Sequence, residues 1–393
     1  MNRIVKLMRV VVLNRVLALL TEISSPRESI TPRGRHQVRS RRQSRVTLLW
    51  FALVFLTLNV TASIALSHTR VRDPEYGRRA SHLRERIAEN PERPLVLVLG
   101  SSRTAMGVRV AAWEATRSTD ASQSDPLIFN MAIIGSGPVI ELMTLRRIYA
   151  DGFRPAAVVL EYWPPFLHQE DGWTETDRIV RDRLSEHDRH FVREHFPAPE
   201  QVEREMDLRR RNPIFGNRER LLMHVLQWWL PPMKRQNHTW TDLDSWGWKA
   251  GADLEPGMNS VRTEAHSKCA EIYKPLFAAH KISPLSDRAL RESVALARQH
   301  GTAIAFSFLP ESSEFRRLYP AKMEHAFQSH LGGISRELNI PVINCREWMD
   351  DGYLVDGFHL SRAGAAEFSR KFGPAISSTF PDLNGSKAAK VVP

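Results

Sequence analysis

The sequence predicts an α/β protein built on a mostly parallel sheet, and three observations support this fold class. First, residues 95–99 (Leu-Val-Leu-Val-Leu) form an uninterrupted aliphatic run, typical of a strand buried on both faces of a parallel sheet. Second, further apolar runs alternate along the chain with segments of helical periodicity. Third, the links between them are short, and such alternation places helices on both faces of the sheet.

The individual elements follow this alternation in order. We expect strands at 95–99, 127–134, 156–162, 302–309 and 340–343, and helices at 104–113, 139–149, 285–300, 321–338 and 362–372. Pro138 suits the first turn of a helix, because a first turn leaves its N–H groups unpaired and proline has none. A polar, charged stretch at 67–93 predicts one more helix before the first strand.

Residues 166–284 interrupt the alternation and predict an insertion or cap. They lack a clear strand period and are rich in charge. They hold six of the ten tryptophans: Trp173, Trp228, Trp229, Trp240, Trp246 and Trp248. Such rings can stack on sugars or an acyl donor, or they can simply pack the insertion onto the body, and both roles stay open. Residues 221–230 predict an amphipathic packing helix within the insertion.

Residues 46–66 are 21 residues without a charge, the length needed to cross a bilayer as a helix. Four arginines crowd its N-terminal flank: Arg39, Arg41, Arg42 and Arg45. The positive-inside rule then puts the basic arm 1–45 in the cytoplasm and 67–393 outside it, as the extracytoplasmic (periplasmic) domain of a single-pass protein of the cell membrane. Residues 63–65 could also pass as a signal-peptidase site. The apolar segment is longer than the usual core of a signal peptide, so we favour an uncleaved anchor.

The formal net charge of +11 comes from the arm. Residues 1–45 hold 11 basic and 2 acidic residues, and removing these from the totals of 55 and 44 leaves 44 basic and 42 acidic. A nearly neutral body argues against nucleic acid as a partner. Residues 1–20 are predicted to form an interfacial amphipathic helix, unless the start codon has been assigned too far upstream. Residues 24–45 are predicted to be a disordered basic linker.

We expect no metal and no cofactor. The body has two cysteines, Cys269 and Cys345, which permit one disulfide but show no metal-ligand spacing. The glycines near Gly135 lack the lysine of a phosphate-binding loop and the full dinucleotide fingerprint.

Two short motifs contain candidate catalytic residues. Gly100-Ser101-Ser102 follows the first strand at the sheet edge where open α/β folds bind ligands, although a serine there can also just cap the next helix. Asp356 and His359 are three residues apart near the C-terminus, a spacing that lets a carboxylate orient an imidazole so that its second nitrogen acts as a base. Taken alone, that pair also fits an ordinary loop aspartate and histidine.

Together the motifs, over 94–165 and 285–375, resemble the SGNH (GDSL-like) hydrolase superfamily. The resemblance implies a three-layer, flavodoxin-like fold in which Ser102 is the nucleophile and Asp356 and His359 complete a triad. It also implies that the N–H groups of Gly135 and Ser102 hold the oxyanion, with Gly137 as the alternative glycine.

The sequence departs from the family pattern in two places. Ser101 replaces the usual Asp, and the Gly-x-Asn-Asp motif after the third strand is absent, because that strand runs into Glu161-Tyr162-Trp163. The family's asparagine donor is therefore missing. Arg103 could replace it or could pair with Glu161, and we expect Arg103, Glu161 and Glu311 as candidates for substrate binding.

The motif Gly-Ser-Ser-Arg and the predicted anchor look like divergent members of the superfamily, the alginate-acetylation and D-alanine-transfer proteins of the cell envelope. This implies a serine esterase or O-acyltransferase acting on acyl, especially acetyl, esters of an extracytoplasmic polysaccharide. The implied partners are the bilayer, an acylated carbohydrate or acyl donor, and envelope-assembly proteins. A non-catalytic polymer-binding or assembly protein remains the alternative. Weaker still is a DNA- or membrane-surface binder that uses the basic arm.

Overall fold

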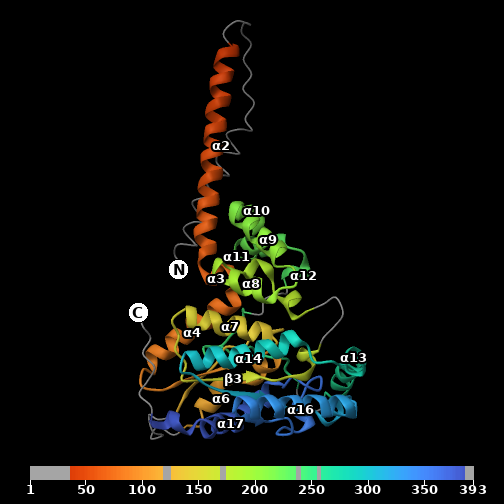
Figure 1. The fold of residues 1–393 in the computed structure, drawn as a ribbon. Coiled ribbons are helices and arrows are strands. Elements are labelled where there is room, and N and C mark those ends of the chain that lie inside the picture. The colour runs from red at the N-terminus through yellow and green to blue at the C-terminus, as the bar shows by residue number, and fades with distance from the viewer. Residues whose placement is uncertain (1–35, 118–124, 169–173, 236–239, 255–257, 386–393) are drawn as a thin grey trace. The chain divides into compact units, whose positions relative to one another are not determined.

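The computed structural model describes residues 36–117, 125–168, 174–235, 240–254 and 258–385 (Figure 1). By its contacts the chain divides into two units, 1–58 and 59–393, which we describe separately. The predictions for 1–20, for most of the linker 24–45 and for Trp173 fall outside the described residues.

The first long element is helix α2 (His36–Ser67), which contains the predicted span. Its segment Gln43–Ser67 is long and apolar enough to cross a membrane, and its most apolar window is 6% buried. This length and composition suit both a membrane anchor and a signal sequence. The chain continues through α3 (Thr69–Arg72) and α4 (Pro74–Glu89), so the helix expected within 67–93 is present.

The sheet has five parallel strands in the order β2-β1-β3-β4-β5, which is the order of flavodoxin-like folds. They are β1 (Leu95–Leu99), β2 (Leu127–Asn130), β3 (Ala157–Glu161), β4 (Ala303–Phe308) and β5 (Val342–Asn344). The second strand ends four residues earlier than expected. The Asn130 side chain accepts the Ala132 N–H at 3.1 Å in a local turn, while the N–H groups of Met131 and Ile133 still bond to the carbonyls of Val98 and Gly100.

Helices cover both faces of this sheet, as the alternation predicted (Figure 1). One face packs on α4, α7 (Pro138–Ala150), α14 (Pro284–Gln299) and α16 (Ala321–Leu338). The other packs on α6 (Val110–Glu114) and α17 (Arg362–Thr379). Because side chains alternate along a strand, Leu97 of β1 lies in the first core and its neighbour Val98 lies in the second.

The prediction of a single helix at 104–113 is wrong in one respect. It is divided into α5 (Ser102–Gly107) and α6, with a break at Val108 and Arg109. The Asn130 amide donates to the carbonyls of Thr104 and Val108, both at 2.9 Å, and so satisfies the Val108 carbonyl, which a continuous helix would have paired with a later N–H.

Helices are the main regular elements of the insertion within its described residues, although 240–254 contains turns and a single bridge instead. Its helices are α8 (Arg189–His195), α9 (Pro199–Arg211), α10 (Pro213–Gly216), α11 (Arg218–Val225), α12 (Pro232–Arg235) and α13 (Asn259–Ala278). We call residues 174–235 the cap. The packing helix expected at 221–230 stops at Val225 and continues as a 3-10 turn. The short helix α15 (Ser313–Arg316) lies after β4.

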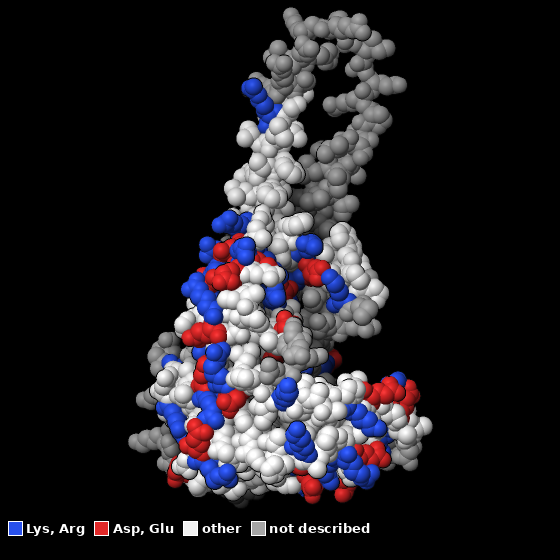
Figure 2. All heavy atoms as spheres, turned by 45° about the vertical axis from the view of Figure 1, so that its right-hand side comes forward, with Lys and Arg blue, Asp and Glu red and all other residues white. Residues whose placement is uncertain are grey.

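The described tryptophans of the insertion fall into a buried group and an exposed group, and only the packing role is seen in the structure. Trp240 and Trp248 are buried, and Trp246 packs against the core, so these rings fix the insertion to the body. Trp228 and Trp229 are 61% and 68% exposed. Basic and acidic side chains are interspersed on the face shown in Figure 2, in keeping with the nearly neutral body.

Candidate active site

Ser102 is the first residue of α5, directly after β1 and the turn Gly100-Ser101. The Ser101 hydroxyl accepts a hydrogen bond from the Arg103 N–H at 3.1 Å, so the capping role belongs to Ser101 and the Ser102 hydroxyl is left for another partner. That partner is His359. The Ser102 Oγ lies 2.7 Å from the His359 Nε2, although the two residues are 257 positions apart in the chain.

The other ring nitrogen of His359 faces Asp356. The Nδ1 lies 2.7 Å from the Asp356 Oδ2, and the Oδ1 of the same carboxylate accepts the His359 backbone N–H at 2.9 Å. Between them Gly357 has φ +101°, a conformation that an L side chain rarely adopts. Burial raises the pKa of Asp356, but the hydrogen bond and charge of His359 outweigh it and hold the pKa below its usual value. The carboxylate therefore stays ionised beside the imidazole.

The last helix positions this loop against the first one. The Ser361 hydroxyl caps α17 by accepting the Gly364 N–H at 3.2 Å. Further along α17, the Ser369 hydroxyl accepts the Arg109 N–H at 2.7 Å, between α5 and α6. The helix that follows His359 thus packs on the helices that follow Ser102, which brings together the two motifs found in the sequence.

Glu161, at the end of β3, supports the turn that carries Ser102. Its Oε2 accepts the Ser101 N–H at 2.7 Å and the Thr104 hydroxyl at 2.8 Å. A Cβ on Gly100 would collide with both the Thr104 hydroxyl and the Glu161 carboxylate, so only glycine fits at that position. Glu161 is 3% exposed. The expectation that it contacts substrate is therefore corrected, because its carboxylate is already used inside the protein.

Arg103 is also buried, at 2% exposure, and the expectation of a substrate contact is corrected for it as well. Its Nη2 donates to the carbonyls of Leu309 and Pro310 at 2.8 and 3.0 Å. Its Nη1 lies 3.4 Å from the Glu161 Oε1, which is the ion pair considered as the alternative. Its Nε donates to the Phe358 carbonyl at 3.4 Å, so one guanidinium joins the β4 edge to the residue before His359.

Glu311, the third expected substrate contact, is fully buried and is corrected for the same reason. One oxygen accepts from the Trp163 indole at 3.0 Å and from the Tyr319 hydroxyl at 2.8 Å. The other accepts from the Arg346 guanidinium at 2.7 Å. Sequence reasoning missed Arg346, since nothing in the local pattern marks it as the partner of a residue 35 positions away.

The loop after β2 carries the two glycines expected to hold an oxyanion. The Gly137 N–H donates to Glu175 at 2.7 Å and is therefore already used. Gly135 has φ +80°, is partly exposed, and its N–H has no hydrogen-bond partner among the described residues. The loop starts beside the serine turn, because the Ile133 N–H donates to the Gly100 carbonyl at 3.0 Å.

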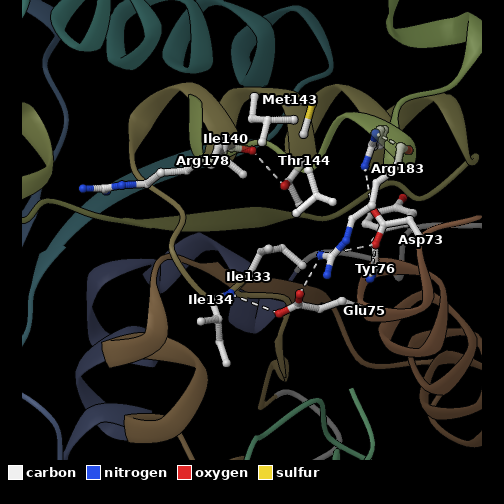
Figure 3. Close-up of a pocket in the computed structure, with 13 residues that line it drawn as sticks. Asp73, Glu75, Tyr76, Ile133, Ile134, Ile140, Met143, Thr144, Arg178 and Arg183 are labelled. Atoms are coloured by element: carbon white, nitrogen blue, oxygen red, sulfur yellow. Dashed lines mark hydrogen bonds and ion pairs between the residues drawn. The ribbon is translucent and has the colours of Figure 1, made fainter. Parts of the chain in front are cut away.

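Two buried carboxylates hold this loop in place, and sequence reasoning missed both. Glu75 of α4 accepts the Ile134 N–H at 3.1 Å and is paired with Arg183 at 2.8 Å, at a cavity of about 120 Å³ (Figure 3). Glu175 accepts from Gly137, Val139 and Ile140 at the start of α7. Each lies outside the recognised motifs, so only burial in the folded protein reveals its role.

The candidate metal ligands and cysteines of the described part of the chain form no metal cluster and no disulfide. No cluster of three or more metal-binding side chains occurs within the described part of the chain. Cys269 and Cys345 are both buried and free, so the disulfide that the count permitted is not formed. Burial raises the pKa of the Cys269 thiol to about 12, which leaves it protonated and unreactive at neutral pH.

Comparisons with known proteins add little to this geometry. No family model matches the sequence, and no curated protein does. Eight chains of solved structures match the fold. One of them is a proposed acylhydrolase from Bacteroides fragilis, with a TM-score of 0.35 and 12% sequence identity over 76% of this chain and 96% of that one. At this distance the functional argument rests on the contacts of Ser102, His359 and Asp356.

Proposed function

We propose that this protein is a membrane-anchored serine esterase or O-acyltransferase. The observation that carries the proposal is the continuous chain from Ser102 through His359 to Asp356, with 2.7 Å at both links. A hydroxyl is a weak nucleophile unless a base lies within hydrogen-bond reach, and the base works better when a third group orients it. Both conditions are met here.

The proposed reaction begins with attack of the Ser102 Oγ on an ester carbonyl carbon while its proton passes to the His359 Nε2. The resulting oxyanion accepts hydrogen bonds from the N–H groups of Ser102 and Gly135, neither of which has a partner among the described residues. Collapse breaks the bond to the leaving alcohol, which takes the proton from Nε2. Water or a sugar hydroxyl then attacks the acyl-serine by the same steps in reverse, and Asp356 stabilises the imidazolium in both halves.

The missing asparagine donor is not replaced by the residues that follow β3. The Tyr162 hydroxyl is hydrogen-bonded to His330 at 2.9 Å, and the Trp163 indole donates to Glu311. Losing one oxyanion donor typically costs about 10²–10³ in rate. We therefore expect a slow esterase, for which a polymer held close to its site is a suitable substrate.

The substrate and location follow from the resemblance and from the apolar helix. We propose acyl esters, especially acetyl esters, of an extracytoplasmic polysaccharide, handled by residues 67–393 outside the cell membrane. In this arrangement 46–66 is the anchor, 1–45 the cytoplasmic arm and 166–284 the insertion. The bilayer and an acylated carbohydrate or acyl donor are the proposed partners, with envelope-assembly proteins as further candidates.

Labelling of the full-length protein with a fluorophosphonate probe tests the activated serine. We expect labelling of the wild type and of Ser329→Ala, a control that removes an exposed hydroxyl on α16, and its loss in Ser102→Ala and His359→Ala. Labelling that persists in Ser102→Ala would refute the assignment. An unlabelled but folded wild type would favour the alternative of a non-catalytic polymer-binding protein.

A further inference from the structure

A groove of about 340 Å³ lies where the chain leaves the apolar helix. Ser63, Leu66 and Ser67, from the end of α2, line one part of it, and Arg181, Arg209 and Arg210 of the cap line another. All of these residues belong to the unit 59–393. The groove therefore joins an apolar helix end to a group of guanidinium side chains.

The basic groups of this groove have unused donors. Arg72 also lines it, and its Nε atom is buried without a hydrogen-bond partner among the described residues, as is the Nη1 of Arg209. The two carboxylates of the lining are already engaged, since Asp182 pairs with Arg220 at 2.6 Å and Glu186 is bonded to Arg189. Among the described residues, Arg72 and Arg209 thus keep an unpaired donor at this groove, while Arg181 pairs with Glu205 at 2.8 Å and Arg210 pairs with Glu186 at 3.7 Å on the exposed side. Guanidinium groups match the geometry of phosphate oxygens, so a phosphate anion suits this group of arginines.

Exposed apolar side chains lie on the elements next to this groove. Helix α11 contacts the residues just after α2, because the His224 Nε2 lies 3.0 Å from the Val71 carbonyl. The 3-10 turn that follows α11 exposes Trp228 and Trp229, and α9 and α10 expose Leu208 at 59% and Phe215 at 72%. Tryptophan and phenylalanine beside arginine are the residues enriched where a membrane meets water.

We propose that this groove binds the phosphate head group of an anionic phospholipid. In this arrangement Arg72 and Arg209 hold the phosphate with Arg210 beside them, and the acyl chains begin at the end of α2, at Ser63 and Leu66. Trp228 and Trp229 then sit in the head-group layer. The site would hold the cap against the bilayer at the base of the anchor. The proposal rests on the anchoring part of the proposed function and is independent of the reaction at Ser102.

Thermal melting of the full-length protein in detergent tests the head-group site. Dioctanoyl phosphatidylglycerol, dioctanoyl phosphatidylcholine and inorganic phosphate are added separately at equal concentrations. We expect phosphatidylglycerol to raise the Tm of the wild type by about 4 °C at saturation, and the other two compounds to raise it by much less. An equal shift with phosphatidylcholine would overturn a site for an anionic lipid. An equal Tm shift with inorganic phosphate would show that the groove binds free phosphate, and would overturn the proposal that its ligand is a lipid.

Two double variants assign the shift to the groove. Arg209→Gln with Arg210→Gln should abolish it. Arg204→Gln with Arg211→Gln removes the same charge from exposed positions of the same helix outside the groove lining, and should retain it. If both double variants lost the Tm shift, or if neither lost it, the assignment of the lipid to this groove would be refuted. A Ser102→Ala protein should keep the full lipid shift, which separates failure of this site from failure of the proposed reaction.

A second measurement leaves the arginines intact and does not depend on how those variants fold. The full-length protein is placed in nanodiscs made with brominated phosphatidylglycerol, in a Trp50→Phe background that removes the indole of the apolar helix. We expect strong quenching, most of which disappears when Trp228 and Trp229 are both changed to phenylalanine. Quenching unaffected by this change would show that the cap does not reach the head-group layer.

Discussion

The Glu161 carboxylate accepts the backbone N–H of Ser101 at 2.7 Å, which ties the end of β3 to the turn that presents Ser102. The same oxygen accepts the Thr104 hydroxyl, and the other oxygen faces the Arg103 guanidinium at 3.4 Å. A single buried charge therefore organises the first turn of α5. The residue works through the position of Ser102 and has no need to touch substrate.

Changing Glu161 to glutamine should lower both stability and turnover. The amide keeps the shape of the side chain but removes the charge opposite Arg103, and breaking a buried pair on one side typically costs about 3–5 kcal/mol. Because the Ser101 turn loosens, kcat should fall about tenfold or more, with KM little changed. Thermal melting and ester hydrolysis by the full-length protein measure the two effects.

The exposed Glu264, on α13, provides the control for this substitution. Its pairing with Lys268 is at the surface, so Glu264→Gln should change neither stability nor kcat. A Glu161→Gln protein with wild-type stability and turnover would show that the carboxylate does not organise the turn.

Changing Asp356 to asparagine should leave the fold intact and reduce kcat by about 10³–10⁴-fold. The amide oxygen can still accept the His359 backbone N–H, but the amide NH₂ facing Nδ1 favours the tautomer with its proton on Nε2. That nitrogen then cannot accept the Ser102 proton. Single-turnover acylation with a chromogenic ester measures the loss, and circular dichroism checks the fold. A loss of less than tenfold would argue against an orienting role for Asp356.

Glu175 should make stability fall with rising pH. Burial raises its pKa to about 7, even though three backbone N–H groups act in the opposite direction. In the unfolded chain the carboxyl titrates near 4.5, so the folded state holds more protons between these two values. The stability from this group is therefore fully present below about pH 4.5 and is lost as pH rises through 7.

The difference in Tm between the wild type and Glu175→Gln, measured from pH 4.5 to 7.5, isolates this contribution. As pH rises, the Tm of the wild type should fall relative to that of the variant, because the glutamine does not titrate. Parallel curves for the wild type and Glu175→Gln would contradict the raised pKa.

The two glycines of the loop after β2 should respond differently to alanine. At Gly135 an added Cβ meets no atom within 4 Å, and the cost comes only from its φ of +80°, about 1–2 kcal/mol. At Gly137 the Cβ would lie 2.9 Å from the Glu175 carboxyl and displace its three hydrogen bonds, so the loss should be larger. Melting temperatures of the two variants give the order, and the reverse order would contradict it.

The parts of the fold that were predicted from sequence are those with strong local signals. The run at Leu95–Leu99 is a strand with all five residues buried, and the helix at 321–338 appears with these bounds. The residues of the two motifs were also identified, and the structure brings Ser102 within hydrogen-bond distance of His359. Their catalytic role remains a prediction for the labelling experiment.

The parts that sequence reasoning missed depend on contacts between distant segments. Arg103, Glu161 and Glu311 looked like substrate contacts because charged residues at strand ends usually face solvent or ligand. In the fold Arg103 faces both carboxylates, at 3.4 and 3.9 Å, and Arg103 and Glu161 also bind backbone groups, which no local pattern shows. Glu75 and Glu175 were overlooked for the same reason, since each binds a loop more than 35 residues away.

The placement of Ser102 and His359 near opposite ends of the body has a consequence for biogenesis. The base comes from the loop just before α17, and α17 must pack beside α5 and α6 before that loop is held in place. In the proposed reaction, a growing chain therefore carries an ordinary, unreactive serine until synthesis has passed residue 379. The proposal thus predicts that Ser102 becomes a nucleophile only on completion of the fold, and that truncated chains lacking α17 are not acylated.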